Sequence, residues 1–254
     1  MEPARIAKRL VKATLPEDLR QRIERARQPT VAGGWERYAR EFEDDNGGFL
    51  GDEWTDPAEM GVDAAPEDVV DYLDRRVFAP FLGTCEVLLE IGPGGGRFTE
   101  ILLPKCERLI AAEAAPTMLA HLRRRFAANP KLEYLVVKDA SLEPLPDDSV
   151  DAVFSYGVFV HLHEWDIFSY LREVARVLRP GGRAVIEHSN TLSELGWATF
   201  LRDLPHCVGR HKAPGAFTAM TPELMRVFCE RAGLQVVEVV TDVVRRDAIT
   251  LLRA

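Results

Sequence analysis

The sequence of 254 residues has few of the features that mark secreted, membrane-spanning or nucleic-acid-binding proteins. Its four cysteines are scattered and form no CxxC pair, so we expect reduced thiols in a cytoplasmic protein and no metal site. No apolar run approaches the ~20 residues of a membrane span, and the first residues lack the apolar core of a signal peptide. The net charge of −8 argues against a nucleic-acid partner.

The most informative stretch is a short apolar run followed by closely spaced glycines. Residues 87–91 are apolar except for Glu90, a composition typical of a buried parallel strand. The glycines stand at alternate positions, namely Gly92, Gly94 and Gly96. A strand, a glycine turn and a helix N-terminus at residues 98–103 let the backbone approach a ligand closely. Because Arg97 stands where a Gly-x-Gly-x-x-Gly motif has its third glycine, the spacing argues against a dinucleotide.

The pattern Glu-x-Gly-x-Gly-x-Gly that begins at Glu90 resembles the first motif of the class I S-adenosylmethionine-dependent methyltransferases. The resemblance implies that S-adenosylmethionine is the cofactor and that the glycine turn holds its amino-acid end. It also implies that Glu90 helps to hold the turn and the ammonium group of the cofactor. The stretch Leu-Arg-Pro-Gly-Gly at residues 178–182 is a further hallmark of the same family.

The ends of three further predicted strands supply the other cofactor contacts that we expect. Glu113 stands near the distance from the glycines at which nucleotide-binding folds place an acid, and its carboxylate can accept hydrogen bonds from both hydroxyls of a ribose. By the resemblance, Asp139 accepts a hydrogen bond from the adenine amino group, and the backbone N–H of Ala140 meets the ring. The alternatives are a solvated acid at Glu113 and a turn-forming aspartate at Asp139. The expected set is completed by Ala114 and Tyr156.

The order of apolar runs and turns predicts an α/β fold, namely a doubly wound, Rossmann-like sheet of seven strands. The sheet is expected to be mostly parallel with an antiparallel last strand, because the β-rich runs at 234–241 and 248–253 are similar to the closing hairpin of the methyltransferases. We assign residues 1–80 to an N-terminal helical arm and lid, and residues 81–254 to the methyltransferase domain. Within that domain, residues 188–220 are the expected acceptor-binding cap.

Histidines stand where the fourth and fifth predicted strands end. His161 and His163 follow the strand over residues 150–156, and His188 follows the strand over residues 183–187. A neutral imidazole suits the removal of a proton from an acceptor hydroxyl at neutral pH. We therefore name His161 as the first candidate for a general base, with His163 second and His188 as a rival. The alternative is a histidine that caps a helix or fills the core.

The resemblance matches the N-terminal third only loosely. We interpret residues 1–28, which are charged and helix-permitting, as a solvated or dimerising arm rather than a membrane-surface helix. A homodimer through this arm stays open. Tyr38 shares a predicted helical face with Trp35 and Phe42. Tyr38 and Trp54 are candidates for contact with the cofactor or the acceptor, and the alternative is that they only pack helices onto the domain.

These observations predict an enzyme that moves the methyl group of S-adenosylmethionine to an oxygen of a small polar molecule or saccharide. Two alternatives stay open: an NAD-dependent oxidoreductase on a related fold, and a non-catalytic methyltransferase-like interaction module. Arg97 and the predicted terminal hairpin oppose the first alternative. The complete set of acids and glycines of the expected cofactor site opposes the second.

Overall fold

The computed structural model describes residues 30–42, 49–51, 57–62, 68–127, 129–208 and 215–254. The chain divides into two units, Met1–Thr30 and Val31–Ala254, and nearly all described residues belong to the second. The predicted arm at residues 1–28 and Trp54 lie outside the described residues. The helices from residue 31 onward belong to the same unit as the sheet, and the predicted division at residue 80 stays a prediction.

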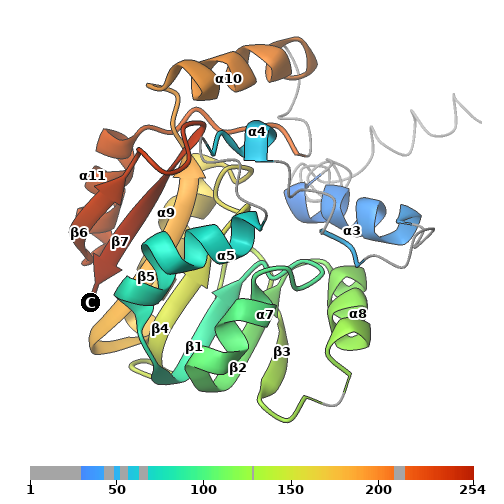
Figure 1. Cartoon of the computed structure of the whole chain (residues 1–254), viewed down its shortest axis with the longest axis vertical. Helices are drawn as coiled ribbons and strands as arrows, with labels where there is room; N and C mark the ends of the chain where they lie inside the picture. The colour runs from blue at the N-terminus through green and yellow to red at the C-terminus, as the bar shows by residue number, and fades with distance from the viewer. Residues whose placement is uncertain (1–29, 43–48, 52–56, 63–67, 128, 209–214) are drawn as a thin grey trace, which may run out of the picture. The chain divides into compact units, whose positions relative to one another are not determined.

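A single sheet of seven strands forms the centre of the described unit, in the order β3-β2-β1-β4-β5-β7-β6 (Figure 1). The strands are β1 (Cys85–Ile91), β2 (Cys106–Glu113), β3 (Leu132–Val136), β4 (Val150–Ser155), β5 (Leu178–Ser189), β6 (Gln235–Val240) and β7 (Asp247–Arg253). Strands β1 to β5 are parallel, and β7 runs antiparallel to both β5 and β6. The predicted fold, including the antiparallel last strand, is confirmed.

Helices cover both faces of this sheet, as expected for parallel strands that are apolar on both sides. The helices are α3 (Val31–Glu41), α4 (Pro57–Met60), α5 (Val69–Leu73), η2 (Asp74–Phe78), α6 (Ala79–Leu82), α7 (Thr99–Leu102), η3 (Leu103–Lys105), α8 (Pro116–Arg125), α9 (Glu164–Val177), α10 (Glu194–Cys207) and α11 (Pro222–Ala232). Thr221 caps the start of α11, since its side chain accepts a hydrogen bond from the Leu224 backbone N–H.

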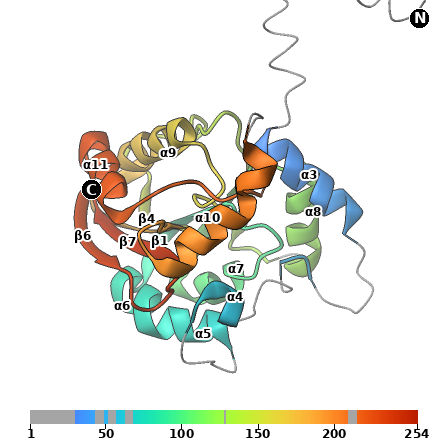
Figure 2. The same cartoon turned by 90° about the horizontal axis from the view of Figure 1, so that it is seen from above.

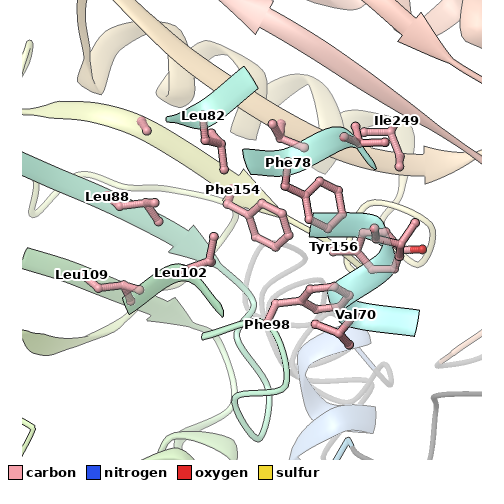
Figure 3. Close-up of a cluster of buried hydrophobic side chains, with 14 of the residues drawn as sticks. Val70, Phe78, Leu82, Leu88, Phe98, Leu102, Leu109, Phe154, Tyr156 and Ile249 are labelled. Carbon is pink, nitrogen blue, oxygen red and sulfur yellow. The ribbon is translucent and has the colours of Figure 1, made fainter. Parts of the chain in front are cut away.

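The core divides into two apolar layers, one on each face of the sheet. One layer gathers aromatic rings beneath α5, η2 and α6, where Phe78 packs edge-on against Phe154 at 4.9 Å between ring centroids (Figure 3). The other layer packs α9 and α11 on the sheet, through residues such as Leu171 and Cys229. Because both faces of β1 are filled, its carboxyl end and the turn that follows are held rigidly.

Two helices approach the carboxyl ends of the parallel strands. Helix α3 lies beside α8, where Glu36 accepts hydrogen bonds from the Thr117 backbone N–H at 2.9 Å and from its hydroxyl at 2.6 Å. Helix α10 crosses above the same edge of the sheet in both views (Figures 1 and 2). The chain thus places α3 and α10 over the edge at which open α/β sheets bind ligands.

Candidate active site

The glycine turn after β1 adopts a conformation that requires glycine. Gly92, Gly94 and Gly96 have φ angles of 69°, 57° and 97°, which side-chain-bearing residues rarely adopt. A Cβ on Gly96 would stand 2.4 Å from the ring of Phe126 and 2.6 Å from the side chain of Leu122, both at the C-terminal end of α8. A Cβ on Gly94 would meet no protein atom within 4 Å. The turn is therefore packed against protein side chains at Gly96, whereas at Gly94 no protein atom fills the space next to the backbone.

Two buried acids stand at the ends of β1 and β2 and hold this turn. Glu90 accepts a hydrogen bond of 2.6 Å from the Thr99 hydroxyl, and burial raises the pKa of Glu90 to about 8. Glu113 accepts hydrogen bonds from the backbone N–H groups of Ala115 at 2.9 Å and Gly94 at 3.4 Å. Burial also raises the pKa of Glu113. The predicted amino-acid-binding and ribose-binding acids thus lie at one turn.

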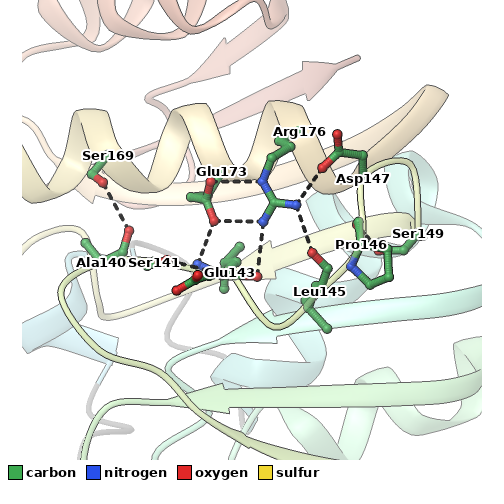
Figure 4. A network of polar contacts seen from close by, with 11 residues as sticks. Ala140, Ser141, Glu143, Leu145, Pro146, Asp147, Ser149, Ser169, Glu173 and Arg176 are labelled. Carbon is green, nitrogen blue, oxygen red and sulfur yellow. Dashed lines mark hydrogen bonds and ion pairs between the residues drawn. The ribbon is translucent and has the colours of Figure 1, made fainter.

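The residues expected at the adenine have an unusual backbone. Asp139 and Ala140 both have positive φ angles, 53° and 50°, a conformation that costs an L-residue ~1–2 kcal/mol. A polar network from α9 holds the segment that follows (Figure 4). Ser169 donates to the Ala140 carbonyl at 3.2 Å, and Arg176 donates to the carbonyls of Leu142 and Leu145 at 3.1 and 2.8 Å.

The same network joins the segment to α9 through a second backbone contact. Glu173 accepts the backbone N–H of Leu142 at 2.8 Å and forms an ion pair with Arg176 at 2.8 Å. The rigid helix therefore fixes the exposed Asp139 and the backbone of Ala140 relative to Glu113.

Tyr38 lies on the face of α3 that packs toward the turn after Glu113. Its ring meets Trp35 at 6.0 Å between centroids, and both rings pack against the cluster that contains Ala115 and Met118. This contact confirms the shared helical face. It places Tyr38 near Ala114, and its contact with a cofactor stays a prediction.

Tyr156 follows β4 and is buried beside the glycine turn. Its ring packs on Phe98 at 4.6 Å between centroids, while its hydroxyl has no hydrogen-bond partner among the described residues (Figure 3). Burial raises the pKa of Tyr156, and the neighbouring carboxyl groups of Glu187 and Asp247 add to this. A buried hydroxyl without a partner costs about 1–3 kcal/mol. This hydroxyl is thus an unsatisfied polar group in the interior.

His161 lies on the loop after β4 and is held between aromatic rings. Its imidazole meets Trp35 of α3 at 5.1 Å and Phe217 at 5.3 Å between centroids. The loop is fixed by Thr218, whose backbone N–H donates to the Val160 carbonyl at 2.7 Å. His163, by contrast, is exposed at the N-terminal cap of α9 and makes no capping hydrogen bond with its side chain. The structure therefore brings His161, and not His163, toward α3.

His188 lies inside the sheet rather than in the loop where we expected it. Strand β5 continues to Ser189, and both ring nitrogens of His188 are engaged at 2.9 Å, by the Ser189 carbonyl and the Thr250 hydroxyl. Burial lowers the pKa of His188 to about 4. Because His188 is fully buried and both nitrogens are occupied, we do not carry it forward as a base.

Sequence reasoning missed three charged residues beside Tyr156. Glu187 and Asp247 are fully buried, and Arg246 donates two hydrogen bonds to Asp247 at 2.8 and 2.6 Å. The Arg246 guanidinium also lies 4.7 Å above the ring of Phe217. One signal could have identified Glu187, since it stands near the end of an apolar strand in the same way as Glu90 and Glu113.

The predicted cap is more apolar outside than its polar sequence suggested. Helix α10 exposes a row of large apolar side chains, namely Trp197, Leu201 and Leu204, followed by Val208. Asp203 on its inner side accepts the backbone N–H of Phe217 at 2.9 Å, which links α10 to the segment beside His161.

Among the described residues, no helix is long and apolar enough to cross a membrane. Within the same ranges, no group of three or more His, Cys, Asp or Glu residues could hold a metal ion.

Comparisons with known proteins agree with this geometry. A family described as a methyltransferase domain matches residues 89–186. A probable S-adenosylmethionine-dependent methyltransferase of Mycobacterium tuberculosis is 36% identical over 131 residues, which are 50% of this chain and 46% of that protein. The malonyl-[acyl-carrier protein] O-methyltransferase of Serratia marcescens is 30% identical over 173 residues, 66% of this chain and 62% of that protein. The chain spans about half the length of the first of these relatives.

A solved structure shares this fold. The crystal structure of a methyltransferase dependent on S-adenosylmethionine from Aquifex aeolicus superposes with a TM-score of 0.57 at 18% identity. The superposition covers 86% of this chain and 97% of that one.

Three local features fit S-adenosylmethionine. No protein atom lies within 4 Å of a Cβ built on Gly94, so the backbone is open to a ligand there, and the carboxylate of Glu113 stands at the same turn. The Tyr156 hydroxyl, buried near the same turn, has no hydrogen-bond partner among the described residues. Glycine turn, strand order and relatives agree, and together they support a class I S-adenosylmethionine-dependent methyltransferase with S-adenosylmethionine as its cofactor.

Proposed function

We propose that the protein transfers the methyl group of S-adenosylmethionine to an oxygen of a small polar molecule or saccharide. The observation that carries this proposal is the placement of His161. Its imidazole is clamped between Trp35 and Phe217, on the loop that leaves the sheet beside Tyr156 and the glycine turn. A relative whose name states O-methyl transfer to malonyl-[acyl-carrier protein] supports an oxygen acceptor.

The cofactor residues act mainly by positioning. Glu113 would hold the ribose, the Asp139–Ala140 segment would hold the adenine, and the glycine turn with Glu90 would hold the amino-acid end. Bound S-adenosylmethionine supplies a methyl group that is activated for direct displacement. Fixing donor and acceptor in line accounts for a large part of the rate of such a reaction.

The proposed role of His161 is to take the proton of the acceptor hydroxyl as the oxygen–methyl bond forms and the carbon–sulfur bond breaks. A neutral imidazole can do this at neutral pH. Trp35 and Phe217 restrict the orientation of the ring, so little rotational freedom is lost when the acceptor binds. Their apolar faces also provide contact area for the carbon skeleton of the acceptor.

A labelling experiment tests this function. Methyl-labelled S-adenosylmethionine is incubated with the protein and an extract of the source organism, and glycans, lipids, proteins and small metabolites are separated. We expect base-stable label in a hydroxylated acceptor, as an ether. Base-labile label would indicate a carboxylate oxygen and an ester, for which no base is needed. Label on nitrogen or carbon would contradict the proposal.

A matched pair of variants tests the base once an acceptor is known. His161→Ala should lower kcat about 10²- to 10⁴-fold, the usual contribution of general base catalysis. His163→Ala is the control, since His163 is exposed two residues away. Equal activity of the two variants would refute the assignment of His161.

A further inference from the structure

A buried pair of carboxyl groups lies behind the loop that carries His161. Strands β5 and β7 bring Glu187 and Asp247 together, because Ser189 pairs with Asp247 and Ile249 pairs with Glu187 in the antiparallel register. Both side chains are fully buried, and each carboxyl group acts on the pKa of the other, so the two lie close together. Two acids have thus been placed side by side in the interior.

The surrounding donors account for only two of the four carboxyl oxygens. Oε2 of Glu187 accepts the Gly157 backbone N–H at 2.9 Å, and Oδ2 of Asp247 accepts both hydrogen bonds from Arg246. The other oxygens, Glu187 Oε1 and Asp247 Oδ1, have no donor among the described residues. One guanidinium cannot compensate two buried carboxylates, so the pair must share a proton. The proton belongs on Glu187, because Arg246 favours the charged form of Asp247.

Glu187 also contacts Gly157, at the start of the loop that carries His161. Gly157 has a φ of 71°, so the chain turns sharply there. Val158 follows and packs against the glycine turn so closely that a Cβ on Gly92 would stand 2.2 Å from its Cγ2 atom. A hydrogen bond to the Gly157 N–H therefore fixes the loop relative to the cofactor turn, four residues before His161.

We propose that Glu187 is a positioning residue that, carrying the proton it shares with Asp247, holds the Gly157 N–H and so sets Val158 against the glycine turn and His161 against the acceptor. The part that concerns His161 rests on the proposed function. The part that concerns cofactor affinity does not. Glu187 itself touches neither cofactor nor acceptor.

This arrangement depends on pH. The groups that face Glu187 are Asp247 and Arg246 on β7 and its preceding turn, and Tyr156 after β4. Burial, followed by the charge of Asp247, raises the pKa of Glu187 well above its usual value. In alkaline solution, loss of the shared proton leaves two adjacent carboxylates, whose repulsion should loosen the Gly157 contact and weaken cofactor binding.

Glutamine is the informative substitution. In Glu187→Gln, the amide oxygen can accept the Gly157 N–H, and the amide nitrogen can donate to Asp247, with no proton to lose. Glu187→Ala removes both bonds, and Glu223→Gln, at an exposed site on α11, is the control. The readout is the Kd of S-adenosylhomocysteine by calorimetry from about pH 6 to about pH 9.5, a range that begins near the ordinary pKa of His and ends below that of Lys.

We expect Glu187→Gln to stay within about threefold of the wild-type Kd at neutral pH, and Glu187→Ala to bind about tenfold more weakly, a change of ~1.4 kcal/mol. Relative to the wild type and Glu223→Gln, Glu187→Gln should also keep more of its affinity in alkaline solution. Three results would overturn the inference: Gln as harmful as Ala, Ala equal to wild type, or Gln with the wild-type pH profile.

The design separates this inference from the proposed function. Calorimetry needs no acceptor, so the Glu187 variants are decided even if no methyl acceptor is found. If Glu187→Ala fails to fold, the neutral-pH affinity and the pH profile of Glu187→Gln still decide the question. Methyl transfer with an unchanged Glu187→Gln profile would leave the proposed function standing and refute only the positioning role.

Discussion

A methyl group on Gly94 should separate cofactor binding from folding. The residue has a φ of 57°, so Gly94→Ala carries the left-handed cost of ~1–2 kcal/mol. Its new Cβ meets no protein atom within 4 Å, so no packing cost is added. At this chain length, such a cost lowers Tm by about 2–4 °C per kcal/mol.

The binding cost comes from the ligand side. The space that the new methyl group enters is the space we assign to the cofactor. Inserting a methyl group into a well-packed contact costs about 1–3 kcal/mol, which corresponds to roughly a 5- to 150-fold higher Kd. Calorimetric titration with S-adenosylhomocysteine measures this cost, and a thermal melt measures the strain.

Gly233→Ala is the matched control for Gly94→Ala. Gly233 ends α11 with a φ of 94°, and a Cβ there also meets no atom within 4 Å. Both variants should lose similar stability, and only Gly94→Ala should lose affinity. If Gly94→Ala bound S-adenosylhomocysteine with the wild-type Kd, the cofactor would not approach this turn and the reasoning would be refuted.

Three further variants test the electrostatics of the site. Burial raises the pKa of Glu90 to about 8, above its ordinary 4.5, so the folded state retains a proton that the unfolded state loses. The free energy of unfolding therefore falls as pH rises through this window, by up to ~1.4 kcal/mol per pH unit. Glu90→Gln should flatten the dependence of the unfolding free energy on pH, measured by urea unfolding. An unchanged slope of that dependence would contradict the burial argument. His188 acts in the opposite sense, because burial lowers its pKa from 6.5 to about 4. The free energy of unfolding should drop as pH falls through that window, and it should drop less in His188→Gln; the same urea unfolding experiment measures both. Arg176→Ala leaves two backbone carbonyls without their donor and should weaken S-adenosylhomocysteine binding about three- to tenfold. Arg172→Ala, at an exposed position on the same helix, is the control and should not change the affinity. Equal affinities of the two variants would show that the segment after Ala140 keeps its conformation without Arg176.

The local geometry of the candidate cofactor site could be predicted from the sequence because its determinants are local. Glu90, Gly94 and Gly96 lie within one turn, and their φ angles and contacts follow from a strand that ends in glycines. Glu113 could be placed by its distance from that turn. The mostly parallel sheet with its antiparallel last strand also followed, since short apolar runs alternate with amphipathic helices and the two terminal β-rich runs resemble a closing hairpin.

The acceptor half could not be predicted in the same way. Glu187 and Asp247 meet only because β5 and β7 pair across a long sequence separation, and no local pattern encodes that register. The same pairing extends β5 to Ser189 and draws His188 into the sheet. Phe217 reaches His161 through backbone contacts of Thr218, which sequence periodicity does not reveal.

The central claim is that the turn at Gly92–Gly96 and the carboxylate of Glu113 bind S-adenosylmethionine. The most direct test is calorimetric titration of the protein and of Glu113→Gln with S-adenosylhomocysteine and, separately, with NADH. The account predicts saturable binding of S-adenosylhomocysteine at one site, weakened about tenfold or more in Glu113→Gln by loss of a charged hydrogen-bond acceptor, and no binding of NADH. NADH binding without S-adenosylhomocysteine binding would contradict it and favour an oxidoreductase.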